Sequence, residues 1–125
     1  MIYFISGHRD ITEEEFNNNY KPIIKELSKN KNNFYVIGDY HGVDIMAQNY
    51  LVKLGCENNI TVYHMHETPM NLNPKITKLI GGFKTDIERD SAMTNISDID
   101  IAFVRNSKWD SGTAQNIMRR HRLNN

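Results

Sequence analysis

The 125-residue chain predicts an α/β fold in which helices cover both faces of a small, mainly parallel sheet of about four to five strands. Short apolar runs alternate with longer segments whose apolar residues recur at helical spacing. Glycines directly follow the first two apolar runs, at Gly7 and Gly38. No linker or internal repeat divides the chain, so we expect residues 1–125 to form a single domain.

The first part of the chain alternates strand and helix signals. Residues 2–6 and 34–37 are predicted strands, and Thr12 with Glu15 forms a capping box that begins a helix. Pro22 lies inside that helical pattern and is expected to kink the helix or divide it in two. The predicted core-facing residues of this segment are Phe16, Ile23, Ile24 and Leu27.

The next helix is predicted over residues 43–54, with Gly55 as its end. Its predicted sheet-facing residues are Ile45, Met46, Tyr50 and Leu54. A third strand follows at residues 60–64, and residues 67–82, which contain two prolines and a Gly-Gly pair, are predicted to be a loop. The remaining predicted elements are a helix at 85–95, a strand at 99–104 and a helix at 112–122.

The composition narrows the classes of function. Fifteen basic residues balance fifteen acidic ones, so no overall field draws the chain to an acidic membrane, and nucleic-acid binding is disfavoured. No apolar run approaches the roughly 20 residues of a membrane span. The apolar start of the chain is short and lacks the basic region of a signal peptide. The single cysteine, Cys56, cannot form an internal disulfide, which is typical of a cytoplasmic protein.

Histidines raise the question of a metal site. His64 and His66 alternate along a predicted strand, and His8 and His41 lie on predicted loops. Zinc sites need three or four firmly held ligands, and the usual cysteine or His-Glu-x-x-His spacings do not occur. We therefore expect neither a bound metal nor another cofactor.

In parallel sheets ligands bind beyond the carboxyl ends of the strands, where loops and helix N-termini converge. The first such loop contains the candidate ligand contacts Ser6, Gly7, His8 and Arg9. Glycine permits close backbone approach, serine offers a hydroxyl, and arginine pairs with phosphate or carboxylate groups. The alternative is a helix-entry turn in which Arg9 pairs with Asp10.

The candidate ligand contacts of the second loop are Gly38, Asp39, Gly42 and Asp44. Two glycines and two acids after a strand suit a ribose hydroxyl or an amine. The adjacent Tyr40 or His41 is available to stack on a base. Alternatively, Asp44 is only the N-terminal charge of its helix, favoured by the helix dipole.

The candidate contacts of the third loop are Asp110, Ser111, Gly112 and Thr113. A small-residue turn before a helix presents backbone N–H groups and the positive end of the helix dipole to an anion. Arg89 is a further candidate because its planar fork clamps phosphate, and the alternative is a surface pair with Asp86 or Asp90. Trp109, beside this loop, is suited equally to stacking on a base and to filling a subunit interface.

Four motifs occur in order along the chain: ISGHRD at 5–10, GDYHGVDIMA at 38–47, Arg89 with Met93 and Asp98, and GTA at 112–114 with Arg119 and Arg120. They resemble the V-x-G-S-R, G-x-A-x-G-x-D-x-x-A, R-x-x-x-M-x-x-x-x-D and G-T-A-D-M-x-R-R-A elements of the SLOG superfamily, which groups DprA-like proteins with LOG-like nucleotide hydrolases. The resemblance covers nearly the whole chain. It implies a three-layer, Rossmann-like sandwich that binds a nucleotide or nucleotide-derived ligand.

One departure from the LOG-like pattern concerns catalysis. Residues 104–111 replace and lengthen the Pro-Gly-Gly loop, and Asn116 stands where those hydrolases carry a glutamate. Cleavage of an N-glycosidic bond needs a carboxylate, whereas an amide only hydrogen-bonds the ribose. Asn116 is therefore predicted to be a ligand contact, and the candidates for catalysis are Arg89, Asp110 and Asp44.

The sequence favours binding, by which the protein senses or sequesters a nucleotide or nucleotide-derived small molecule. The alternative is a nucleoside or nucleoside 5′-monophosphate N-glycosidase, or a 2-deoxyribosyltransferase, that cleaves the base–sugar bond. LOG-like proteins dimerise through helices, so the resemblance implies a homodimer or higher homo-oligomer. The apolar residues expected to be left uncovered by one small sheet are Ile87, Met93, Ile117, Met118 and Leu123.

Overall fold

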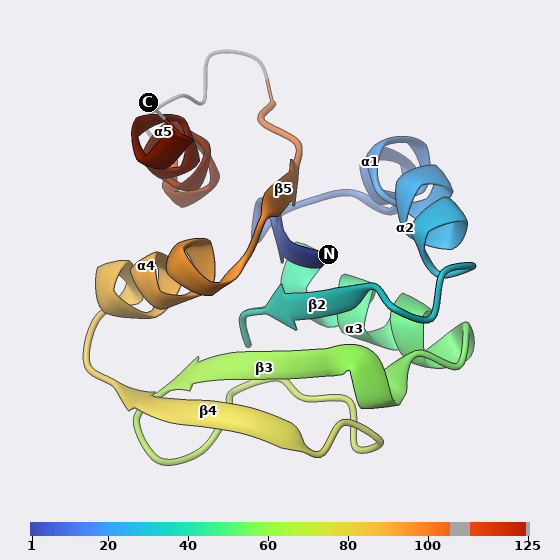
Figure 1. Ribbon diagram of the computed structural model, residues 1–125, viewed down its shortest axis with the longest axis horizontal. Helices are drawn as coiled ribbons and strands as arrows, with labels where there is room; N and C mark the ends of the chain where they lie inside the picture. The colour runs from blue at the N-terminus through green and yellow to red at the C-terminus, as the bar shows by residue number, and fades with distance from the viewer. Residues whose placement is uncertain (106–110, 125) are drawn as a thin grey trace.

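A computed structural model describes residues 1–105 and 111–124. The elements along the chain (Figure 1) are β1 (Ile2–Ser6), α1 (Glu13–Asn19), α2 (Lys21–Leu27), β2 (Phe34–Ile37), α3 (Val43–Lys53), a short 3-10 helix (Glu57–Asn59), β3 (Ile60–Met65), β4 (Lys78–Phe83), α4 (Asp86–Ile96), β5 (Ile99–Ala102) and α5 (Gly112–Asn124).

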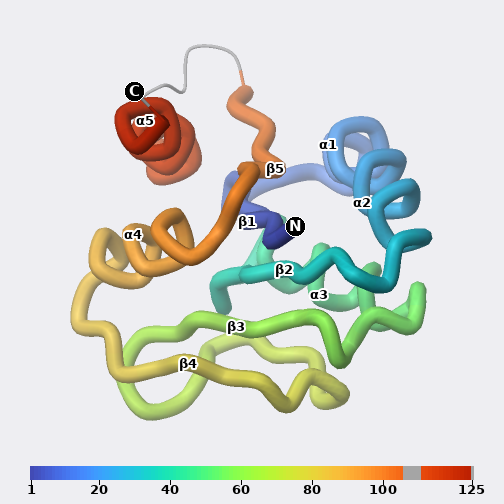
Figure 2. The backbone as a smooth tube through the Cα atoms, viewed as in Figure 1, coloured from blue at the N-terminus to red at the C-terminus, as the bar shows by residue number. Residues whose placement is uncertain are grey.

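The predicted fold class is confirmed: the protein is a Rossmann-like, three-layer α/β sandwich. Within the described ranges the sheet has five strands in the order β4-β3-β2-β1-β5, and every neighbouring pair is parallel. Figure 2 shows β1 between β2 and β5. The chain steps outward from β1 to β4 and then crosses back to β5. The strand order therefore reverses beside β1, the position at which open α/β sheets bind ligands.

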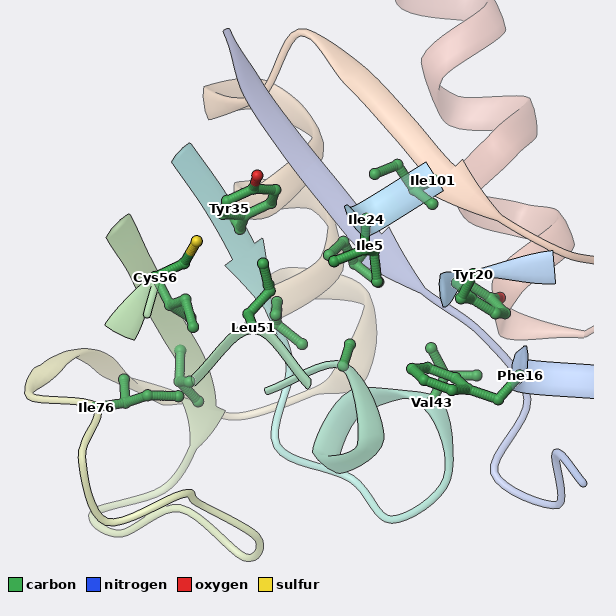
Figure 3. Packing of buried hydrophobic residues seen from close by; sticks show 14 residues of the cluster. Ile5, Phe16, Tyr20, Ile24, Tyr35, Val43, Leu51, Cys56, Ile76 and Ile101 are labelled. Carbon is green, nitrogen blue, oxygen red and sulfur yellow. The ribbon is translucent and has the colours of Figure 1, made fainter. Parts of the chain in front are cut away.

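Two helical layers cover the faces of the sheet. The larger core cluster lies between the sheet and α1, α2 and α3, and Figure 3 shows Ile5, Phe16 and Leu51 among its members. The smaller cluster lies under α4 and consists of Phe4, Val36, Tyr63 and Met93. Neighbouring residues of β1 therefore belong to different clusters, as the two-residue period of a strand requires.

The first helical segment is divided as the sequence predicted. Thr12 and Glu15 form the capping box that begins α1, and Pro22 lies in the first turn of α2, where its missing N–H costs nothing. Phe16 and Ile24 are buried. The prediction for Ile23 was wrong, because this side chain is 47% exposed on the outer face of α2.

The prediction of the buried face of α3 was correct only in part. Val43, Ala47 and Leu51, spaced four residues apart, face the sheet and are fully buried. Met46, Tyr50 and Leu54 pack at the edge of the cluster, and Ile45 is partly buried. Apolar side chains occur on most sides of this helix, so their spacing alone did not determine which side packs.

The loop predicted over residues 67–82 contains a strand that the sequence pattern did not indicate. β4 pairs with β3 at the edge of the sheet, and most of its residues are exposed. The sequence pattern did not indicate this strand because two consecutive glycines, Gly81 and Gly82, are typical of turns. Gly81 lies against the imidazole ring of His64, which leaves no room for a Cβ atom, and Gly82 has a φ of +88°. Glycine within a strand often marks a position where the backbone closely approaches another group, as it does at Gly81.

Candidate functional site

A cavity of about 310 Å³ lies at the carboxyl end of β1, between the loops that follow β1 and β2, the helix α4 and the start of α5. Its volume is at the lower end of the range for small-molecule sites. The lining residues are Phe4, Ser6, Gly7, His8, Arg9, Gly38, Tyr40, Asp44, Asp86, Arg89, Asp90, Met93, Ser111, Gly112, Thr113 and Asn116.

The fold brings most of the predicted ligand contacts together around this cavity. Those that line it are Ser6, Gly7, His8, Arg9, Gly38, Asp44, Arg89, Ser111, Gly112, Thr113 and Asn116. Asp39 and Gly42 are not among the lining residues. Asp39 pairs with Arg89, and Gly42 packs against the backbone of His8 and Arg9. Asp110 and Trp109 lie outside the described residues. Two of the three catalytic candidates, Arg89 and Asp44, therefore face the cavity.

Arg105 holds the loop after β1 through contacts with His8 and Asp10, whereas the hydroxyl of Ser6 at the end of β1 has no partner among the described residues. Ser6 is 93% buried, and its Oγ has no hydrogen-bond partner in the part of the chain that the structure describes. His8 is buried, and its Nε2 accepts a hydrogen bond of 2.9 Å from the Arg105 backbone N–H. The Arg105 guanidinium binds the carboxylates of Asp10 and Glu15. The predicted alternative pairing of Arg9 with Asp10 is therefore replaced by an Arg105–Asp10 pair.

Gly42 allows the first and second loops to touch. Its φ is +82°, and a Cβ atom placed on it would lie 2.5 Å from the carbonyl oxygens of both His8 and Arg9. The Val43 N–H donates to the His8 carbonyl across the same contact. Glycine is required here because the two backbone segments approach closely. Gly42 thus has a structural role and does not line the cavity.

Substitution of Gly42 by alanine is expected to destabilise the protein by about 3 kcal/mol or more, because it adds a steric clash to an unfavourable backbone conformation. Gly55→Ala is the matched control, since Gly55 has a φ of +81° but no atom lies within 4 Å of the position that a Cβ would take. That variant should lose only about 1–2 kcal/mol. Urea unfolding of both measures the difference, and equal losses would show that the loop contact at Gly42 is loose.

Arg89 is the centre of a buried ion-pair network. Its side chain is only 5% exposed, and its Nη1 donates to Asp39 Oδ1 at 3.0 Å. Nε and Nη2 both donate to Asp90 Oδ1, at 3.2 and 3.1 Å. Nη2 also lies 3.8 Å from Asp86 Oδ1. The predicted pairs with Asp86 and Asp90 thus exist, and they engage the fork that was expected to clamp phosphate. Asp90 is largely buried, whereas the Asp86 side chain is 44% exposed.

Tyr40 connects the two arginines with the carboxylates. The guanidinium carbon of Arg9 lies 3.7 Å from the centre of the Tyr40 ring, and that of Arg89 lies 4.7 Å from it. The Tyr40 hydroxyl donates to Asp86 Oδ1 at 2.6 Å. Since Arg9 already covers the ring, Tyr40 does not offer that face to a base. His41 is exposed and does not line the cavity.

The position of Asp44 fits both roles that the sequence left open. It lies in the first turn of α3, and it also lines the cavity, where its Oδ2 accepts a hydrogen bond of 3.1 Å from the Tyr40 N–H. Burial is the main reason why the pKa of Asp44 is raised from 3.8 to about 7. The charges of Asp90 and Asp39 act in the same direction, whereas the hydrogen bond from the Tyr40 N–H and the charge of Arg89 lower this pKa. Near neutral pH this carboxyl is therefore partly protonated.

The start of α5 forms the remaining wall. Ser111 caps the helix, since its Oγ accepts from the Ala114 N–H, and the first turn contains no acidic residue. The first N–H groups of a helix have no partner within it, so they are available to an anion. Asn116 is buried, and its Oδ1 accepts from Arg119 at 2.7 Å. Its amide also hydrogen-bonds Asp90, which counteracts the rise that burial causes in the pKa of that carboxyl.

The lining residues that the sequence did not assign to the site are Phe4, Asp86, Asp90 and Met93. Asp86 lies three residues before Arg89 on α4, and that spacing, which places two side chains on the same face of a helix, was a usable signal. Met93, which was expected to be uncovered, is instead part of the smaller core cluster.

The described residues contain no group of three or more His, Cys, Asp and Glu side chains arranged to hold a metal ion. None of the helices in the described ranges is both long and apolar enough to cross a membrane. Comparison of the chain with protein-family models, with curated proteins and with solved structures gave no significant match.

Proposed function

We propose that the cavity binds a nucleotide or nucleotide-derived small molecule, which the protein senses or sequesters. The observation that carries this proposal is the meeting, at the cavity wall, of two groups that offer hydrogen-bond donors: one has no partner among the described residues, and the other has N–H groups without a partner inside their own helix. One is the buried Oγ of Ser6, and the other is the N-terminus of the 13-residue helix α5. A hydroxyl and helical N–H groups are donors that suit a phosphate.

The other groups of the cavity suit the remainder of such a ligand. Asp86 and Asp90 are carboxylates that line the cavity, and carboxylates accept hydrogen bonds from sugar hydroxyls. Arg9 and Arg89 offset their charge, so the cavity does not repel a ligand with a phosphate. The ordered resemblance to SLOG motifs supports the same class of ligand.

Self-association and a cytoplasmic location are further parts of the proposal. Two of the apolar residues expected to be uncovered are exposed, Ile87 by 70% and Leu123 by 55%, which supports a homodimer or higher homo-oligomer. Cys56 is a buried free thiol, as is common in proteins of a reducing compartment.

Ser6→Ala tests the proposal with little disturbance of the fold. Because Ser6 Oγ has no partner in the described chain, its removal should change the free energy of unfolding by less than about 0.5 kcal/mol. Affinity for the best-bound nucleoside monophosphate, measured by calorimetry, should fall about 3- to 10-fold.

Thr94→Val is the matched control, since Thr94 Oγ1 is also buried and without a partner in the described ranges but does not line the cavity. This variant should bind as the wild type does. Wild-type affinity in Ser6→Ala would remove Ser6 from the site. Failure of every nucleotide tested to bind or to raise the melting temperature of the wild type would overturn the proposed function itself.

Cleavage of the base–sugar bond is the second candidate function, and one observation favours it. Although Asn116 provides no charge, the carboxylates of Asp44, Asp86 and Asp90 line the same cavity. One of them is able to stabilise positive charge at the sugar, and the partly protonated Asp44 is able to donate a proton to the departing base. Chromatography of the calorimetry samples for free base separates binding from turnover.

A further inference from the structure

Arg9 is held flat against Tyr40 at the opening of the cavity. Its guanidinium carbon lies 3.7 Å from the ring centre, which is the contact distance of a planar stack. Its Nη2 donates to Asp86 Oδ2 at 3.4 Å, and the other oxygen of Asp86 accepts from the Tyr40 hydroxyl at 2.6 Å. Asp86 therefore ties the arginine and the tyrosine together and limits rotation of the guanidinium plane.

One face of this guanidinium lies against Tyr40, and the exposure of the side chain implies that the opposite face is open. The Arg9 side chain is 53% exposed and lines the cavity. Since Asp86 already balances its charge, Arg9 offers a ligand a planar surface more than an unpaired charge. Planar guanidinium groups stack on nucleobases, and stacking tolerates any base because every base has a π-face.

The other planar groups of the cavity are not open in this way. Phe4 and His8 are 1% and 7% exposed, and the ring of Tyr40 lies under Arg9. Arg89 is 4% exposed, and its fork is engaged by Asp39 and Asp90. Among the described residues that line the cavity, Arg9 is thus the planar group with an exposed face.

We propose that Arg9 is the base-binding platform of the site: the purine or pyrimidine of the ligand stacks on the guanidinium face remote from Tyr40. This inference rests on the proposed function, and it assigns the base to the Arg9 side of the cavity and the phosphate to the α5 side. It also replaces the expected role of Arg9 as a phosphate contact.

The test compares ligands that share one part of a nucleotide. Wild-type protein and Arg9→Lys are titrated by calorimetry with the 5′-monophosphates of adenosine, guanosine, cytidine and uridine, with the four nucleosides, and with ribose 5-phosphate. Lysine keeps the charge but lacks the plane. Affinity for monophosphates and nucleosides should fall by a similar factor, about 5- to 30-fold, while affinity for ribose 5-phosphate stays within about twofold of wild type.

Arg122→Lys, an exposed arginine of α5 outside the cavity, is the matched control and should change no affinity. Weaker monophosphate and ribose 5-phosphate binding with unchanged nucleoside binding would make Arg9 a phosphate contact and overturn the inference. Unchanged affinity for every ligand would overturn it as well, as would a wild type that binds ribose 5-phosphate as tightly as the nucleotides. A wild type that binds none of these ligands refutes the proposed function instead.

Discussion

Arg89→Ala is expected to destabilise the protein by about 3–5 kcal/mol, the largest loss among the side-chain substitutions at the site. The side chains of Asp39 and Asp90 are only 2% and 15% exposed, and Arg89 is the cation that both of them contact. Truncation leaves these carboxylates buried and without their counter-charge. The desolvation cost of an unpaired buried charge exceeds what the lost hydrogen bonds alone contribute.

Urea unfolding at neutral pH measures this loss, with Lys29→Ala as the control. Lys29 pairs with Glu26 at 2.9 Å, but both side chains are well exposed, so its removal should change the free energy of unfolding by about 0.5 kcal/mol or less. Adding Asp39→Asn to Arg89→Ala should recover part of the stability, because it removes one unpaired charge. Equal losses for Arg89→Ala and Lys29→Ala would contradict a buried network.

This network also determines which variants report on ligand binding. A loss of nucleotide affinity in Arg89→Ala would combine a lost contact with a disturbed fold, since Arg89 connects Asp39, in the loop after β2, with Asp90 on α4. Ser6 and Arg9 avoid that difficulty. The Oγ of Ser6 has no partner among the described residues, and Arg9 is half-exposed.

Local signals in the sequence were sufficient for most of the fold. The capping box of α1 lies within four residues, and Gly55 ends α3 with the positive φ that such a position favours. β4 was missed because its two glycines are typical of turns, and the reason for Gly81 lies in His64, on the neighbouring strand. A contact between strands distant in sequence is invisible to a local pattern.

The convergence of the three loops followed from topology alone. Parallel strands place their carboxyl ends at one edge of the sheet, so Ser6, Gly38 and Ser111 were expected near one another, and the structure brings them to one cavity. The partners of Arg89 were not predicted in full, because Asp39 lies 50 residues earlier in the chain. Loop positions thus follow from the order of elements, whereas side-chain pairs depend on tertiary packing.

Asp44→Asn is expected to change how stability depends on pH. The pKa of Asp44 is about 7 in the folded protein and near 3.8 in the unfolded chain, so between these values the unfolded chain releases a proton that the folded protein retains. The contribution of this carboxyl to stability is complete below about pH 4 and is lost as the pH rises through 7. The difference between the folded and unfolded pKa values corresponds to a loss of at most about 4 kcal/mol in the free energy of unfolding.

Asparagine has the shape of the protonated carboxyl and does not titrate. The wild type should therefore lose stability relative to Asp44→Asn as the pH rises from 4 to 7, and Asp44→Asn should stay the more stable protein above pH 7. Urea unfolding of both proteins from pH 4 to 8 measures the divergence, and parallel curves would show that Asp44 ionises freely in the fold.

The protonation state of Asp44 also determines the charge of the cavity lining. While Asp44 is neutral, Arg9 and Arg89 balance Asp86 and Asp90 on its lining; once it ionises, the lining gains a negative charge that opposes a phosphate.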